Sequence, residues 1–111
     1  MANDVKSLAD GQLAAAAATL YTCPTGKTTI VGNFTYVNTD GSTRTVDAWV
    51  QRSGSTARRI IPMSMGLATG SVALICDEEN KLYLSEGDAV RGAADSANLV
   101  DYTIMGVERD A

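Results

Sequence analysis

The chain of 111 residues contains no histidine. Histidine is the usual general base near neutral pH, the commonest metal ligand and the usual activator of a catalytic serine or cysteine, so its absence excludes the sites that depend on it. The three lysines, Lys6, Lys27 and Lys81, have no motif spacing to a serine, which disfavours a Ser-Lys hydrolase. The sequence therefore predicts a protein without enzymatic activity, catalytic residues, metal or cofactor.

Cysteines and long apolar runs are also scarce. Cys23 and Cys76 are too few for a disulfide scaffold or a zinc site, and their apolar neighbours predict buried free thiols. The longest apolar run, at residues 13–18, falls far short of the roughly 20 residues that cross a bilayer. Asp4 and Asp10 precede that run, which disfavours a signal peptide. We therefore expect neither a membrane span nor secretion.

The charge balance is acidic, because 13 aspartates and glutamates outnumber nine lysines and arginines and give a net charge of −4. Proteins that bind nucleic acid need a basic face, and those that hold single strands also need stacking aromatics. The composition therefore argues against nucleic-acid binding. The length and the 45% of hydrophobic residues are typical of one folded domain.

Turn residues recur at the spacing that is typical of an all-β sandwich or barrel. Eight strands are predicted, at residues 17–22, 28–37, 44–52, 58–63, 71–77, 81–84, 89–93 and 99–108. Gly32 indicates a bulge, and Pro62 indicates a sheet edge or a strand end. The sequence thus predicts a single antiparallel β-sandwich domain at residues 20–111, preceded by an N-terminal arm or first strand at residues 1–19.

The strands at 28–37 and 44–52 predict one long hairpin whose turn is Asn38-Thr39-Asp40-Gly41-Ser42. The second of these strands alternates between an apolar face and a polar face, formed by Val46, Ala48 and Val50 and by Thr45, Asp47, Trp49 and Gln51. Residues 71–77 are apolar on both faces, which predicts a central strand that is covered on both sides.

Two groups of residues are candidates for contact with a partner. Trp49 is either an interface anchor beside Asp47 and Gln51 or, if the strand phase is reversed, part of the core. The one basic concentration contains Arg52, Arg58 and Arg59, with Arg44 near the turn. These arginines are either solvated or form a patch that meets carboxylates of a partner.

Three other features predict ordinary structure. The carboxylates at 77–79, with Glu86 and Asp88, lack the alternating ligands of a calcium loop and predict solvated turns. Residues 25–29 resemble part of a phosphate-binding loop, but a predicted strand follows them, so they predict a hairpin turn. Residues 2–20 have too little hydrophobic bulk to build a core alone, and we expect them to lie over a neighbouring subunit, with Leu13 and Leu20 as candidate contacts.

Several segments in order are similar to small virion proteins of tailed bacteriophages. They are residues 20–26, the strand that ends at Asn38-Thr39, Val46 to Val50, Ser85-Glu86-Gly87-Asp88 and the closing Gly106-Val107-Glu108. The resembling proteins include capsid decoration or cement proteins and β-sandwich modules of tails and fibres. The chain departs from their pattern by Cys23 before the first proline and by the arginines at 58–59.

The resemblance implies a jelly-roll-like sandwich, commonly a homotrimer, that is made in the cytoplasm of a host bacterium and becomes part of the virion. There it binds the outer surface of the capsid at junctions between major capsid subunits and stabilises the shell. A tail, collar or fibre component is the first alternative. A carbohydrate-binding module is the second, although only six aromatic residues are present to build a sugar platform. An enzyme is the least favoured class.

Overall fold

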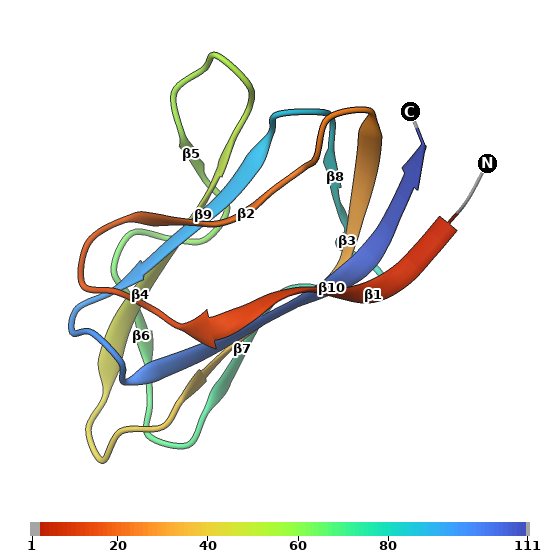
Figure 1. The fold of residues 1–111 in the computed structure, drawn as a ribbon. Coiled ribbons are helices and arrows are strands. Elements are labelled where there is room, and N and C mark those ends of the chain that lie inside the picture. Colours follow the sequence, from red (N-terminus) through yellow and green to blue (C-terminus); the bar gives the residue numbers. More distant parts are fainter. Residues whose placement is uncertain (1–2, 111) are drawn as a thin grey trace.

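The computed structural model describes the backbone of residues 3–110 and the side chains of residues 7–110, and this part of the chain is all β (Figure 1). Its strands are β1 (Asn3–Gln12), β2 (Ala18–Thr22), β3 (Lys27–Asn38), β4 (Arg44–Gln51), β5 (Arg58–Arg59), β6 (Met65–Leu67), β7 (Val72–Cys76), β8 (Leu82–Leu84), β9 (Ala89–Ala94) and β10 (Val100–Asp110). Within residues 3–110 there is no helix that is long and apolar enough to cross a membrane.

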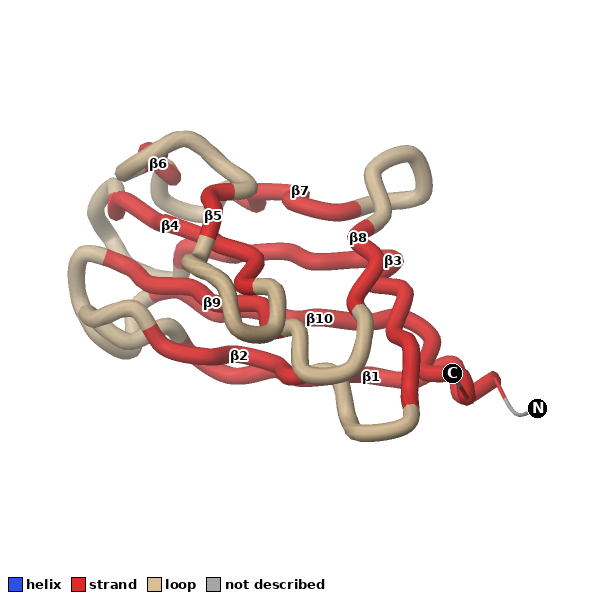
Figure 2. The backbone as a smooth tube through the Cα atoms, turned by 90° about the horizontal axis from the view of Figure 1, so that it is seen from above, coloured by secondary structure: helices blue, strands red, loops and turns tan. Residues whose placement is uncertain are grey.

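The strands form two antiparallel sheets that pack face to face, which confirms the predicted sandwich. Sheet A has the order β1-β10-β3-β7, with β8 also paired to β3, and sheet B has the order β2-β9-β4-β5, with β6 also paired to β4. Short strands share positions, so ten strands occupy eight places, and Figure 2 shows both layers from above. This order of strands in the two sheets is the connectivity of a jelly roll.

The predicted hairpin between residues 28–37 and 44–52 is wrong. Both strands exist, but β3 lies in sheet A and β4 in sheet B, so the segment between them is a corner that carries the chain across the sandwich. The buried Asn38 holds this corner: its Nδ2 donates to the carbonyls of Ser42 and Leu67 at 2.9 and 2.8 Å, and its Oδ1 accepts from the amide of Asp40 at 2.8 Å. The turn at 24–26 likewise joins the two sheets.

The N-terminal segment is a strand of sheet A and not a free arm. Strand β1 pairs with β10 from Asn3 opposite Arg109 to Gln12 opposite Asp101. Leu13 follows directly and is fully buried, and its amide donates to the carbonyl of Val100 at 2.9 Å. Pairing with β10 therefore attaches this segment to the domain, and Leu8 and Ala9 also pack against the core. The part before residue 3 lies outside the described residues.

Strand β7 is an edge strand, whereas the sequence predicts a central one. It pairs with β3 alone, and the outward side chains of Val72 and Leu74 are exposed. Its other face meets the core through the buried Cys76. The predicted second apolar face exists, but nothing in the described part of the chain covers it.

The core lies between the sheets and follows the period-two pattern. Val31, Phe34 and Tyr36 of β3 point inward against Val46 and Ala48 of β4, and all five are fully buried. The inward phase predicted for β4 is therefore confirmed, with Val50 packed against the same cluster. In β3, Asn33 opposes Met105 and Val31 opposes Gly106, which leaves Gly32 as the extra residue of the predicted bulge.

Polar side chains join the two sheets inside the sandwich. The Tyr36 hydroxyl donates to the carbonyl of Asp47 at 2.8 Å, and burial raises the pKa of Tyr36 above its ordinary value. Near the other end of β3, the Tyr21 hydroxyl donates to the buried Glu108 and lies 2.8 Å from the Thr29 hydroxyl. Among the described residues, no buried side-chain nitrogen or oxygen is without a hydrogen-bond partner. These hydrogen bonds between the sheets hold the two sheets, and with them their outer faces, in one relative orientation.

Candidate interaction faces

The outer face of sheet B contains the predicted contacts of β4. Asp47, Trp49 and Gln51 point away from the core, so the outward interpretation of Trp49 is the one that the structure shows. Trp49 is half-buried, because Arg59 of the neighbouring strand β5 lies over its ring with the guanidinium carbon 5.0 Å from the ring centroid. The same guanidinium binds Asp47 at 2.5 Å. Trp49, Asp47 and Arg59 thus form one cation–π and ion-pair cluster.

The predicted arginines have different environments. Arg59 is used within the cluster, whereas the side chain of Arg58 is exposed and forms no hydrogen bond or ion pair with the described residues. Arg52 binds the carboxylate of Asp88 at 3.0 Å and the carbonyl of Tyr83 at 2.6 Å, so it ties the loop after β4 to the β8–β9 turn. Arg44 pairs with Asp40 at 2.7 Å in the corner. Arg58 is therefore the arginine of this group that is open to a partner.

Asp88 holds the loop between β4 and β5 in place. Its carboxylate accepts hydrogen bonds from the backbone amides of Ser53 at 2.8 Å and Ser85 at 2.9 Å, besides the bond from Arg52. Burial alone would raise the pKa of Asp88, but these three donors outweigh that effect and hold the pKa below its ordinary value. Asp88 is consequently a charged structural residue and not a solvated ligand of a cation.

The two leucines predicted as contacts do not form an exposed interface. Leu13 lies inside the sandwich and is fully buried, because β1 leads it into the core. Leu20 is the extra residue of a bulge in β2 and packs partly against the core. The prediction assumed an arm without a place in the sheet, and the pairing of β1 with β10 removes that assumption.

The outer face of sheet A is the surface that sequence reasoning missed. Leu74, Tyr83, Val72 and Met105 are 62%, 60%, 56% and 43% exposed. They lie in register with other outward apolar residues, since Val72 opposes Val37 in β3, and Tyr83 and Val107 both oppose Ile30. We call this set the apolar face, and it consists of Ile30, Val37, Val72, Leu74, Tyr83, Met105 and Val107.

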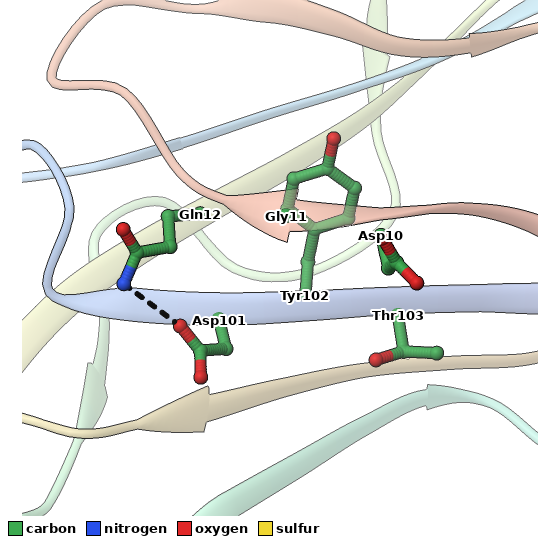
Figure 3. Close-up of a pocket in the computed structure, with 6 residues that line it drawn as sticks. All are labelled: Asp10, Gly11, Gln12, Asp101, Tyr102 and Thr103. Carbon is green, nitrogen blue, oxygen red and sulfur yellow. Dashed lines mark hydrogen bonds between the residues drawn. The ribbon is translucent and has the colours of Figure 1, made fainter.

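Two shallow hollows lie on this outer surface, one at the middle of β3 and β10 and one at the start of β10. The first, of about 360 Å³, is lined by Ile30, Gly32, Asn33, Lys81, Met105, Gly106 and Val107. The second, of about 340 Å³, lies where β1 meets the start of β10 and is lined by Asp10, Gly11, Gln12, Asp101, Tyr102 and Thr103. Figure 3 shows Asp101 and Thr103 on one side of β10 and the Tyr102 ring on the other, with Gln12 donating to Asp101 at 3.1 Å. The outer surface therefore has an apolar hollow at mid-strand, next to Lys81, and an acidic polar hollow at the start of β10.

The remaining sequence features have structural roles. The Asp77 carboxylate accepts from the amides of Glu79 and Asn80 at 2.9 and 3.0 Å and closes its own turn. In the described part of the chain, no three histidine, cysteine, aspartate or glutamate side chains group in a way that would hold a metal ion. Cys23 and Cys76 are buried free thiols, as predicted, and burial raises the pKa of Cys76 to about 11.

Comparisons of the chain with protein-family models, with curated proteins and with solved structures found no significant match. The functional assignment therefore depends on the jelly-roll architecture and on the two outer faces.

Proposed function

We propose that this protein is a structural component of a bacteriophage virion, a decoration or cement protein that binds the outside of the capsid at subunit junctions and stabilises the shell. One observation carries the proposal: the outer face of sheet B of a small jelly roll holds Trp49 in an outward position, with the guanidinium of Arg59 over its ring and bound to Asp47. A rigid outward aromatic residue of this kind is typical of surfaces that other proteins cover. The resemblance of residues 20–108 to small virion proteins supports the location in a virion.

We assign the contact with the capsid protein to the outer face of sheet B. This face has a rigid aromatic anchor, Trp49, beneath the guanidinium of Arg59, whereas Arg58 pairs with Val50 and projects to the other side of the sheet. Aromatic residues and arginine are the types that most often dominate the energy of protein interfaces. Identical copies around a symmetric shell multiply a modest contact of this kind by avidity.

A sugar-binding role fits this surface less well. Its two candidate aromatic residues lie on different sheets, Trp49 on β4 of sheet B and Tyr83 on β8 of sheet A. They therefore do not share one platform on which a glycan ring would stack. A tail, collar or fibre part would share the fold and is separated from a shell protein by its position and copy number in the particle.

The test is binding of the purified protein to capsids that lack it. Trp49 is the only tryptophan, so its fluorescence reports directly on the outer face of sheet B. We expect a blue shift of its emission on binding and an increase in the melting temperature of the shell. Arg59→Ala should weaken binding, because the Trp49 ring loses the guanidinium that covers it, whereas Arg58→Ala, on the other side of β5, is the matched control and should leave binding unchanged. Shells that bind no protein, or binding that leaves the Trp49 emission unchanged and is insensitive to Arg59→Ala, would contradict this proposal.

A further inference from the structure

On the outer face of sheet B, two arginines lie on either side of Trp49. Arg91 of β9 and Arg59 of β5 both oppose Trp49 of β4 in the strand register, and residues directly opposite each other point to the same face. Val90 beside Arg91 is fully buried, which confirms that Arg91 points outward. Figure 2 shows β9, β4 and β5 side by side in this layer. We call Arg91, Trp49 and Arg59 the arginine row.

We propose that the arginine row binds an acidic segment of the partner protein, with a carboxylate of that segment on the guanidinium of Arg91. This contact rests on the proposed function, because it names the chemistry of the capsid surface that would meet sheet B. Three observations favour an acidic partner: the bonding of Arg91, the charge of the face and the rigidity of the row.

Arg91 has no carboxylate partner, in contrast to other arginines near this sheet. Three other arginines each bind a carboxylate at 2.5–3.0 Å. Within residues 7–110, the half-buried Arg91 donates only to neutral oxygens, Oε1 of Gln51 at 3.2 Å and the carbonyl of Ala17 at 3.3 Å. A guanidinium binds a carboxylate through shorter and stronger hydrogen bonds than these, often two in parallel. Arg91 therefore retains its charge and several N–H donors for a carboxylate from outside the chain.

The charge of the face suits a carboxylate better than a polyanion. On the strands of sheet B, the charged side chains that point outward are Arg91, Arg59 and Asp47, which sum to one positive charge. The whole chain has a net charge of −4, so this face is a basic spot on an acidic protein. Nucleic acid carries one phosphate per nucleotide and needs several cations to bind it. One unshared guanidinium matches a single carboxylate, and charge complementarity of this kind selects partners at interfaces.

The arginine row is held in place before a partner binds. The carboxylate of Asp47 binds the guanidinium of Arg59 and accepts from the amide of Ser64 at 2.8 Å. Ser64 has a φ of 49°, which is unfavourable for a residue other than glycine and which this hydrogen bond offsets. Rigid side chains lose little conformational entropy on binding. A partner segment that covers the stacked Trp49 ring can thus place its carboxylate on Arg91, one strand spacing of about 4.8 Å away.

The test is titration of the full chain with a short, end-blocked peptide of alternating glutamate and serine, followed by the emission of Trp49. A peptide of alternating glutamine and serine is the uncharged control, and it should cause no change. Arg91→Gln should raise the dissociation constant of the glutamate peptide by about 10-fold, the effect of losing one charge-assisted contact. Arg58→Gln is the matched control, because Arg58 lies on the other side of the sheet, and it should bind as the wild type does. Thermal unfolding of each variant shows whether it is folded.

Charge reversal separates recognition of the partner from a structural role of Arg91. Arg91→Glu should bind a peptide of alternating lysine and serine in preference to the glutamate peptide, which loss of structure alone would not produce. The proposal is overturned if Trp49 does not respond to the glutamate peptide up to about 1 mM, the limit of weak specific binding. It is also overturned if Arg91→Gln leaves the affinity unchanged, or if a thymidine oligonucleotide binds more tightly than the peptide.

The same variants, tested on capsids that lack the protein, separate this inference from the proposed function. Capsids that bind the wild type and Arg91→Gln equally well would overturn the acidic partner and leave the decoration role intact. Capsids that bind neither, together with a glutamate peptide whose binding requires Arg91, would overturn the decoration role and leave the acidic-segment site intact.

Discussion

Replacing Gly92 by alanine should destabilise the sandwich more than a surface substitution in a strand would. An added Cβ would clash with the Tyr36 hydroxyl oxygen and would lie 2.7 Å from Cδ1 of Leu20. Leu20 is at a bulge and only partly buried, but Tyr36 is fully buried and donates its hydroxyl to the carbonyl of Asp47 at 2.8 Å. The ring must therefore move, and the hydrogen bond that joins the two sheets breaks.

The magnitude follows from these two effects. Loss of a buried hydrogen bond with its partners left unpaired costs about 1–3 kcal/mol, and overpacking of a well-filled core costs a further ~1–3 kcal/mol. We expect a loss of about 3 kcal/mol in the free energy of unfolding. At about 5 °C per kcal/mol for a domain of this size, the melting temperature should fall by about 15 °C.

Denaturant unfolding monitored by circular dichroism measures this change, and a second variant tests its cause. Tyr36→Phe alone should cost about 1 kcal/mol, because it removes the hydroxyl and leaves the ring. In the Gly92→Ala background the same change relieves the clash, so the double variant should be more stable than the sum of the single effects by about 1–2 kcal/mol. Strict additivity, or a Gly92→Ala variant as stable as wild type, would refute the assigned contact.

Three further predictions concern the anchors of the outer faces. Asp88→Asn should lower the free energy of unfolding at neutral pH by about 2–3 kcal/mol. Because folding lowers the pKa of Asp88, this loss should stay constant down to about pH 4 and shrink at lower pH. Acid-unfolding curves measure it, and a loss that does not change with pH would contradict the prediction. Arg59→Ala should shift the Trp49 emission to the red, since the ring loses its cover, with a stability change of about 1 kcal/mol; an unchanged spectrum would show that the guanidinium does not stack. Cys23 and Cys76 should react slowly with a thiol reagent at pH 8 in the folded protein and rapidly in denaturant, and fast labelling of the native state would show that the thiols are accessible.

Much of the fold was predictable because alternation is a local signal. The burial of Val46 and Ala48, the bulge at Gly32 and the free buried thiols all follow from neighbouring residues. The hairpin prediction failed because the residues of a turn do not reveal whether the chain returns to the same sheet. That choice depends on Asn38, whose buried amide binds the carbonyl of Leu67, 29 positions away.

The candidate site was predicted only in part, for a related reason. The pattern places Trp49 and Asp47 on one face of β4, but it does not reveal that Arg59 would pair with both. Both faces of β7 are apolar, as the sequence indicates, but the prediction that both faces are covered in the centre of the sheet was wrong. Strand position depends on long-range pairing, so the same residues became the exposed part of the apolar face.

Imaging of phage particles that contain this chain tests the central claim most directly. The proposed role predicts many symmetry-related copies of the jelly roll on the outer surface of the capsid, with the outer face of sheet B against the major capsid protein. A chain that is absent from the particle, or that is present in a few copies at the tail, would contradict it.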